Sequence, residues 1–495
     1  MTPRLALATV AATLALAGCA TNPVSGGHDV VLTSAKGEVE TSRRDHEQII
    51  KAYGIYADQA VQDYVNAVGQ RVAANSQRGA ELTWHFTVLD DGEVNAFTTG
   101  GGYVYVFRGL LAYLNSEAEL AAVLGHEIGH VNARHPVQAE TRNVLATVLA
   151  TGAVLATGSS AVAEMANIGA TAWVQGYGRE AETQADALGV QYATKTGYLP
   201  EAMSDSMKVM KQQESFEVDR ARIEGREPQV YHGVFSDHPA PDDRVVATAK
   251  AAANITTTPE GGWRENREEY LKAIDGLPYG SSRAQGIVRE NRFYHADMHI
   301  TLAFPHGWTV DNERDRLLAY AHARDGHIQD ALMQLTADAR PEKKSPREYL
   351  LEKLRGASIT HGESLTVNGM EGYTVVTRSG SPLDGGEGPV RWAVLYRDKS
   401  AFLIGGASRS SEDGLPLDDG LFLSSIRTIR DLRPAEYPLA EPYRIKVIEA
   451  TEQTKLDDYA KNVPKEKYQK EELLLLNGLY PKGKLTPGEL VKVVE

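Results

Sequence analysis

The fold of this chain is organised around His126-Glu127-Ile128-Gly129-His130, which lies within Glu117-Ala-Glu-Leu-Ala-Ala-Val-Leu-Gly-His-Glu-Ile-Gly-His-Val-Asn-Ala-Arg-His135. Apolar residues recur here at helical spacing, so we expect one helix over 117–135. On a helix, His126 and His130 lie one turn apart on the same face and can share one Zn²⁺. Glu127 is rotated by about 100° and stays beside the metal, where it can act on a water molecule as a base.

The two glycines in this stretch indicate a close contact. Gly125 and Gly129 each disfavour a helix by about 1 kcal/mol relative to alanine, so another part of the chain is expected to approach the helix backbone there. His135 lies nine residues after His126, on the face expected to be opposite, and we interpret it as a packing or hydrogen-bonding histidine. The alternative for the whole motif is a buried helix whose histidines only form hydrogen bonds. Such a helix would have to satisfy three polar side chains at once.

Composition limits the classes of protein that remain. A chain of 495 residues is expected to form several domains. Its 52 basic and 66 acidic residues give a net charge of −14, which argues against a nucleic-acid partner and for an acidic, soluble surface. The one cysteine, Cys19, cannot form an internal disulfide.

The N-terminus has the pattern of a secretory signal. A short basic start precedes the apolar run 5–16, and Leu16-Ala17-Gly18-Cys19 resembles the bacterial lipobox. We therefore expect a signal peptide over 1–18 and a lipidated tether over 19–28, with Cys19 as the lipidated residue. Ala20, by resemblance to sorted lipoproteins, favours the periplasmic face of the outer membrane. The alternatives are an ordinary signal peptide or an apolar start without a targeting role.

Two short strands are expected before the central helix. Residues 82–89 alternate apolar and polar side chains, and 103–107 form a second strand-like run after three glycines. A sheet edge here could hold a substrate peptide by strand addition. Asn95 and Phe97 are candidate substrate-binding residues at its rim, although ordinary strand-end residues would look the same.

The run 144–157 is rich in small apolar residues. Its fourteen residues are too few to span a bilayer, which needs about 20. A second helix is expected over 161–174, so the segment is predicted to be a helical hairpin. It either packs in the core or offers a surface to a membrane or a partner.

A second acidic helix supplies candidates for the rest of the metal site. Residues 177–189 are helical in pattern, with Glu182 and Asp186 one turn apart. A gluzincin site needs one carboxylate ligand besides two histidines, and Glu182 fits that role. Asp186 could accept the other N–H of a ligating histidine. An acidic helix face alone is usually solvated. His238, in a proline-rich turn, could stabilise an oxyanion, ligate the metal when substrate is absent, or have no role.

The C-terminal half shows no catalytic cluster. We expect a linker plus a charged helix over 251–285 and an α+β accessory domain over 286–431, whose Phe304-Pro-His-Gly-Trp308 resembles the start of PsbP-like modules. This domain is either a platform for substrate or partner, or purely structural. Residues 440–495 partly resemble a LysM module, which implies binding to cell-wall glycan.

Together these motifs resemble metallopeptidase family 48, which contains HtpX-like and BepA-like zinc endopeptidases. The matching residues are Asn95-Ala96-Phe97, His126 to His130, Arg179, Glu182 to Asp186, His238-Pro239 and Arg244. The resemblance covers about residues 28–250 and implies an α+β protein, with a mainly helical gluzincin domain and a small sheet over 29–250. The chain lacks the tetratricopeptide array of the BepA type and the membrane helices of the HtpX type, so it looks closest to the lipoprotein subgroup.

The resemblance also implies residue roles. His126, His130 and Glu182 would bind one Zn²⁺ per chain, Glu127 would be the base, and Asp186 a second catalytic carboxylate or proton donor. His238 or Arg244 would hold the oxyanion. The expected function is hydrolysis of misfolded or unassembled envelope proteins by a lipid-anchored zinc endopeptidase.

Two other classes remain open at this point. One is a chaperone or assembly factor with a latent zinc site, and the other is a cell-wall scaffold. Expected partners are polypeptide substrates, the membrane, and either peptidoglycan or the outer-membrane assembly machinery.

Overall fold

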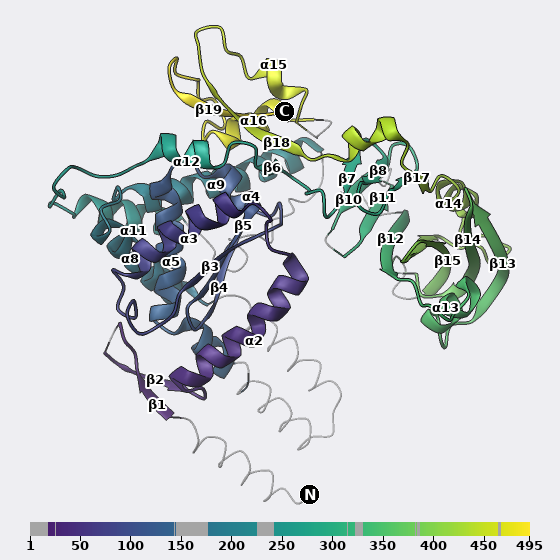
Figure 1. The fold of residues 1–495 in the computed structure, drawn as a ribbon, viewed down its shortest axis with the longest axis horizontal. Coiled ribbons are helices and arrows are strands. Elements are labelled where there is room, and N and C mark those ends of the chain that lie inside the picture. Colours follow the sequence, from purple (N-terminus) through teal and green to yellow (C-terminus); the bar gives the residue numbers. More distant parts are fainter. Residues whose placement is uncertain are drawn as a thin grey trace, which may run out of the picture. The chain divides into compact units, whose positions relative to one another are not determined.

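The computed structural model describes residues 18–24, 26–142, 144, 177–224, 242–313, 315–321, 330–381, 383, 387–463 and 467–495. The chain forms two compact units (Figure 1). Unit 1 comprises Met1–Gly280 and Tyr443–Glu495, and unit 2 is Ser281–Pro442. Both contain helices and strands, so the expected α+β class is confirmed.

A three-stranded sheet lies at the centre of unit 1. Its strands β3 (His85–Leu89), β4 (Ala96–Gly100) and β5 (Tyr103–Phe107) are ordered β3-β5-β4. β3 runs parallel to β5, and β4 runs antiparallel to it. Alternate side chains of β5 enter different cores. Val104 and Val106 join the main core of unit 1, whereas Tyr105 packs with Tyr53, the last residue of helix α2 (Ala35–Tyr53), in a separate aromatic cluster.

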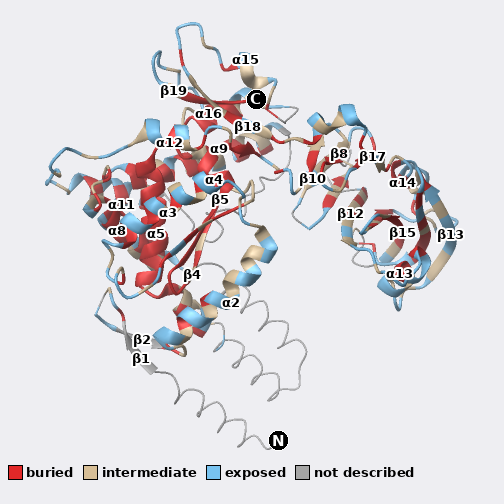
Figure 2. Cartoon of the chain, viewed as in Figure 1, coloured by how far each residue is buried: buried red, intermediate tan, exposed pale blue. Residues whose placement is uncertain are grey.

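Helices surround this sheet. In chain order they are α2 (Ala35–Tyr53), α3 (Gln59–Ala73), α4 (Arg108–Tyr113), α5 (Glu117–Asn132), α8 (Arg179–Lys195), α9 (Ala202–Glu224), α11 (Asp242–Ala253) and α12 (Arg267–Ala273). Every residue of α5 is buried, which is visible as an all-red helix in Figure 2. The Ser116 side chain caps α5 by accepting the Glu119 backbone N–H. The helix expected over 117–135 therefore ends three residues early, at Asn132.

The segment expected to be a flexible tether contains a hairpin. Strands β1 (Gly18–Thr21) and β2 (His28–Val31) pair antiparallel. Asn22 closes the turn, because its backbone N–H donates to Gly27 O at 2.7 Å and its Oδ1 accepts the Val24 N–H at 2.9 Å. These turn contacts, together with a bond from Asn22 Nδ2 to Ala133 O, give the segment fixed structure where we expected a tether.

The C-terminal segment belongs to unit 1. It consists of β18 (Tyr443–Glu449), α15 (Asp457–Ala460), α16 (Gln469–Leu476) and β19 (Leu490–Val494), and β18 pairs with both β19 and β6 (Pro278–Tyr279). Leu473 to Leu476 are part of the same core as α5. The buried Lys492 Nζ donates to Ala112 O and Leu114 O at 2.7 Å each. The predicted LysM-like module is therefore packed into unit 1, and its glycan binding stays a prediction.

The segment 251–285, expected to be a linker plus a charged helix, contains that helix. Its helix α12 buries Tyr270 and Leu271 completely in the core of unit 1. Unit 2 begins at Ser281, close to the expected boundary at 286.

Unit 2 is built on antiparallel sheets. A seven-stranded sheet has the order β10-β11-β12-β16-β15-β14-β13, and a four-stranded sheet has the order β17-β9-β8-β7. The elements are β7 (Ile287–Arg289), β8 (Arg292–His295), β9 (Ile300–Ala303), β10 (Thr309–Asn312), β11 (Leu317–Tyr320), β12 (Ala331–Ala339), α13 (Pro346–Lys353), β13 (Ile359–Val367), β14 (Met370–Ser379), β15 (Glu387–Arg397), β16 (Ser400–Ser408), α14 (Asp419–Ile426), β17 (Arg430–Asp431) and η2 (Pro434–Ala440).

Two predicted segments fall outside the described residues. These are the signal peptide, apart from Gly18, and the helical hairpin over 144–174, of which only residue 144 is described. In the part of the chain that is described, no helix combines the length and the apolar character needed to cross a membrane.

Candidate metal centre

The metal centre depends on the close packing of α5 against α8. A Cβ atom added to Gly129 would lie 3.0 Å from Ala185 O, and one added to Gly125 would lie 3.0 Å from Gly189 O. Only glycine at these positions lets the two helix backbones approach so closely. The close contact inferred from the two glycines is therefore the contact with the helix that carries Glu182.

Three buried side chains converge at this helix pair. His126 and His130 come from α5, and Glu182 comes from α8. The two histidine Nε2 atoms are 3.0 Å apart, and the Glu182 carboxylate oxygens lie 3.5 Å from His126 Nε2 and 3.4 Å from His130 Nε2. A tetrahedral Zn²⁺ with bonds of about 2.0–2.1 Å separates its ligand atoms by about 3.3–3.4 Å. The spacing and the two-histidine, one-carboxylate donor set both fit zinc.

A second layer holds these ligands in place. Asp186 Oδ1 lies 3.0 Å from His126 Nδ1, so the histidine can donate there and keep Nε2 as an acceptor. Arg244, on α11, forms a two-pronged bond to Asp186 with both distances 2.7 Å. Its Nη1 also lies 3.1 Å from Glu182 Oε2. Arg244 therefore contacts the carboxylates behind the site.

The electrostatics of the site follow from these contacts. Burial would lower the pKa of His126, but the carboxylates of Asp186 and Glu182 outweigh it and raise that pKa to about 10. Burial would raise the pKa of Asp186, but Arg244 and His126 lower it below its usual value. The site therefore attracts positive charge to the His126 imidazole and keeps Asp186 ionised.

His135 takes a place that the sequence analysis missed. Arg134 has a left-handed backbone with φ of 58°, so the chain reverses after α5 and does not continue as a helix. This returns His135 to the metal side, where its Nδ1 lies 2.8 Å from His130 Nδ1. Its Nε2 lies 3.0 Å from Gln184 Oε1. His135 is a hydrogen-bonding histidine as predicted, but the prediction of the opposite face was wrong.

Tyr177 was not predicted as a site residue. Its ring centroid lies 4.3 Å from that of His130, and its hydroxyl donates to Thr98 O of β4 at 3.2 Å. The one feature of the sequence that could have drawn attention to Tyr177 is its position directly before Gly178, at the start of the helix that carries Glu182.

The other candidate residues are placed as follows. Glu127 is buried on α5, between the two histidine ligands in sequence, with 1% of its surface exposed. Asn95 is buried and donates to Glu93 Oε1 at 3.2 Å. Phe97 stacks on Tyr105 with a centroid distance of 4.8 Å, in the aromatic cluster with α2 and not in the main core. His238 and the Cys19 side chain lie outside what is described.

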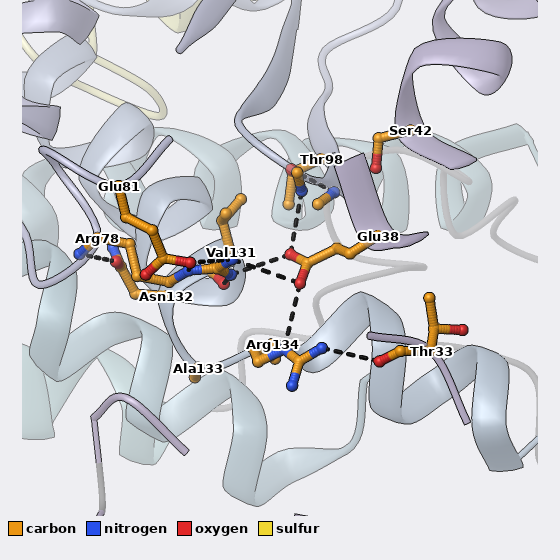
Figure 3. A network of polar contacts seen from close by, with 12 residues as sticks. Thr33, Glu38, Ser42, Arg78, Glu81, Thr98, Val131, Asn132, Ala133 and Arg134 are labelled. Atoms are coloured by element: carbon orange, nitrogen blue, oxygen red, sulfur yellow. Dashed lines mark hydrogen bonds and ion pairs between the residues drawn. The ribbon is translucent and has the colours of Figure 1, made fainter. Parts of the chain in front are cut away.

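A separate charged network fixes the end of α5 (Figure 3). The Glu38 carboxylate of α2 accepts from Arg78 Nη1 at 3.0 Å, Arg134 Nε at 3.2 Å and Gly101 N at 3.1 Å. Arg78 also donates to Val131 O at 3.0 Å. The network therefore ties α2, the β4–β5 turn and the C-terminal end of α5 together.

Two histidines and one glutamate are the donor set of one class of zinc metallopeptidase. The profile of peptidase family M48 matches residues 59–252, which include all three candidate ligands. The chain thus carries a peptidase family M48 domain, and zinc is the metal of that family. The expected family and cofactor are confirmed for this domain.

Curated relatives agree with this assignment. The chain is 31% identical over 225 residues to the beta-barrel assembly-enhancing protease of Yersinia pestis, and 30% identical over 206 residues to that of Escherichia coli. It is 32% identical over 120 residues to the mitochondrial metalloendopeptidase OMA1 of Arabidopsis thaliana, 24% of each chain. The match covers 44% of this chain and 43% of the Yersinia protein, and 40% of each chain for Escherichia coli. The chain thus spans less than half the length of these relatives.

Solved structures give a weaker similarity. The solution structure of cyanobacterial PsbP from Synechocystis matches 30% of this chain and 95% of its own, at 14% identity and a TM-score of 0.22. A TM-score of that size supports no argument about the fold, so the PsbP-like accessory domain stays a prediction.

Proposed function

We propose that this protein is a zinc-dependent endopeptidase of the bacterial envelope, with a gluzincin site, that hydrolyses peptide bonds of misfolded or unassembled envelope proteins. The observation that carries the proposal is the triad of ligand atoms 3.0–3.5 Å apart, with Glu127 between the two histidines in sequence. A structural zinc site is usually closed by four protein ligands, whereas three leave a position for water or substrate.

The residues divide the chemistry between them. Zinc bound by His126, His130 and Glu182 would act as a Lewis acid that polarises the scissile carbonyl. Glu127 takes the proton of the attacking water and passes it to the leaving amine. Asp186 holds His126 in the tautomer that leaves Nε2 free to bind. For the oxyanion we favour His238, because the guanidinium of Arg244 is already engaged by Asp186 and Glu182.

The cellular setting rests on separate support. We propose that Cys19 is lipidated and anchors the protein at the periplasmic face of the outer membrane. Two relatives are named for the assembly of β-barrels, which favours polypeptide substrates connected with outer-membrane assembly. Asn95 and Phe97 remain proposed substrate-binding residues at the rim of the sheet, although the Phe97 ring packs on Tyr105. Peptidoglycan binding by residues 440–495 is proposed as a weaker accessory property.

The test combines metal content with cleavage of an unfolded protein. We would compare wild type with Glu127→Gln, using Glu180→Gln as the matched control, because Glu180 is exposed on the helix that carries Glu182. One zinc per chain throughout is expected, with cleavage lowered by at least about 10²-fold only in Glu127→Gln. Zinc in every variant but cleavage in none would favour the chaperone with a latent site. Absence of zinc from wild type would refute the proposal.

A further inference from the structure

Tyr177 connects the metal centre with the sheet. Its ring lies against the ligand His130 at a centroid distance of 4.3 Å and an interplanar angle of 31°. Its hydroxyl donates to the backbone carbonyl of Thr98, on β4, at 3.2 Å. One side chain therefore spans the distance between a metal ligand and a strand on which a peptide could pair.

The pairing pattern of β4 shows which way the Thr98 carbonyl points. Phe107 N donates to Asn95 O at 2.9 Å, and the register continues as Phe97 opposite Tyr105. In an antiparallel pair, residues that bond to the partner strand alternate with residues whose N–H and C=O point away from it. The backbone N–H and C=O groups of Asn95 and Phe97 thus point toward β5, whereas those of Thr98 point away from it.

This direction is the β4 edge of the sheet. The order is β3-β5-β4, so among the described residues β4 is the last strand on its side. An unpaired edge is a template for a further strand. The Thr98 carbonyl is one of the acceptors that an added strand would use, and the Tyr177 hydroxyl occupies it.

We propose that Tyr177 is a specificity-determining residue that competes with substrate for the edge of β4. The inference rests on the proposed function. A substrate segment in extended conformation replaces the Tyr177 hydroxyl at Thr98 O with one of its own backbone N–H groups. The site therefore selects unfolded segments that can present an N–H at that one position, and it disfavours proline there, since proline has no N–H.

The experiment measures binding of a fluorescein-labelled, Val/Thr-rich peptide without proline, by fluorescence anisotropy. The zinc-loaded protein carries Glu127→Gln in every case, so no cleavage interferes. Tyr177→Phe keeps the ring on His130 and removes the hydroxyl, and it is expected to lower the peptide Kd by about two- to tenfold, the range for one neutral hydrogen bond. Zinc content should not change.

Tyr192→Phe is the matched control. Tyr192 lies on α8, and its hydroxyl bonds Gln77 instead of β4. It is expected to leave the peptide Kd unchanged. Stepwise N-methylation of the peptide adds a second readout: the gain from Tyr177→Phe should disappear when one particular N–H is methylated.

Cleavage kinetics, measured on proteins that keep Glu127, complete the test. Tyr177→Phe should lower KM by the same factor and leave kcat within twofold. An unchanged or raised Kd, no peptide binding in any variant, or a lower kcat at constant KM would each overturn the inference. If wild type cleaves nothing while Tyr177→Phe binds peptide more tightly, the proposed function fails and the competition at β4 stands. If wild type cleaves and Tyr177→Phe leaves the peptide Kd unchanged, the proposed function stands and the competition at β4 is refuted.

Discussion

Two buried polar clusters contact α5, and they arrange their donors and acceptors in opposite ways. Around Glu38, each contact joins a carboxylate oxygen to an N–H of Arg78, Arg134 or Gly101 (Figure 3). Such a cluster is complete without any further atom. It is the pattern of a structural ion pair, in which each buried charge has a partner.

Around His126, acceptors face one another. Asp186 accepts a hydrogen bond from Nδ1–H of His126, so in the neutral imidazole Nε2 keeps its lone pair. The chain from Gln184 through His135 to His130 has the same effect on His130, since His135 donates from Nε2 and accepts at Nδ1. Two lone pairs and a carboxylate then meet within 3.5 Å. A metal cation reconciles them, and without one a proton on His126 does, in keeping with the pKa of His126 being raised to about 10. This separates the site from an ion-pair cluster of similar burial, whose charges are already matched.

The largest effects are expected when the central carboxylate of each cluster, Glu38 or Glu182, is replaced by glutamine. Glu38→Gln leaves two buried arginines short of their counter-charge, so we expect the free energy of unfolding to fall by about 3–5 kcal/mol, with zinc binding retained. Glu182→Gln should abolish stoichiometric zinc binding. Urea unfolding of the metal-free proteins and zinc analysis after dialysis measure the two effects. Glu40→Gln, exposed on the same helix as Glu38, is the control. If Glu182→Gln still binds one zinc per chain, the distinction between a metal site around His126 and an ion-pair cluster around Glu38 is refuted.

A smaller effect is expected from widening the α5–α8 contact. Gly129→Ala places a Cβ 3.0 Å from Ala185 O, which is backbone and cannot move alone. We expect a loss of about 1–3 kcal/mol in stability, together with weaker zinc binding as Glu182 is displaced. Gly420→Ala, in α14, meets no atom within 4 Å and should stabilise the protein slightly. Unchanged stability in Gly129→Ala would show that the helix contact tolerates expansion.

His135 offers a finer test of the lone-pair arrangement. His135→Ala removes the hydrogen-bond acceptor for His130 Nδ1. We expect the zinc affinity to fall by about 10–100-fold, the usual range when a residue that hydrogen-bonds to a metal ligand is removed. His135→Asn supplies an amide oxygen and should recover part of the affinity. Competition with a chromophoric chelator gives the Kd. His46→Ala, whose imidazole contacts Tyr105, serves as the control. Equal affinity in all four proteins would exclude the positioning role.

The smallest effect concerns an ion pair in unit 2, far simpler than either cluster. Arg430, at 2.7 Å from both Glu436 oxygens, lowers the pKa of Glu436 from 4.5 to about 2. The folded state thus binds fewer protons than the unfolded state between these values. The stabilisation is fully present above pH about 4.5 and is lost as the pH falls through about 2. Thermal unfolding of Glu436→Gln should differ from wild type most above pH 4.5, and the difference should close toward pH 2. Glu412→Gln, exposed in the same unit, should show no such convergence.

The cluster of candidate metal ligands could be predicted from the sequence because their spacing is local. His126 and His130 are one helical turn apart, and Glu182 and Asp186 repeat that spacing on a second helix. The two glycines even indicated the helix contact. His135 could not be placed, since its position depends on the left-handed backbone of Arg134, a single dihedral angle that no periodicity reveals.

The C-terminal organisation was harder to predict for a different reason. Strand β18 and helix α16 carry ordinary local patterns, but their packing partners lie hundreds of residues earlier, as in the bond from Tyr279 to Glu472. A chain read in order suggests modules in series. Only non-local contacts reveal that the last segment completes the first unit.

The pairing of β6 with β18 therefore gives unit 2 an unexpected topological status. Tyr279 lies opposite Tyr443, so Ser281–Pro442 is, in effect, the loop of a β-hairpin. The entropy of closing a loop grows only slowly with its length, and an entire unit can be inserted at such a site at modest cost. Deleting or exchanging the segment between Gly280 and Tyr443 would leave every segment of unit 1 in the chain. A stop codon after Pro442 would instead remove the leucines of α16 from the hydrophobic core of unit 1.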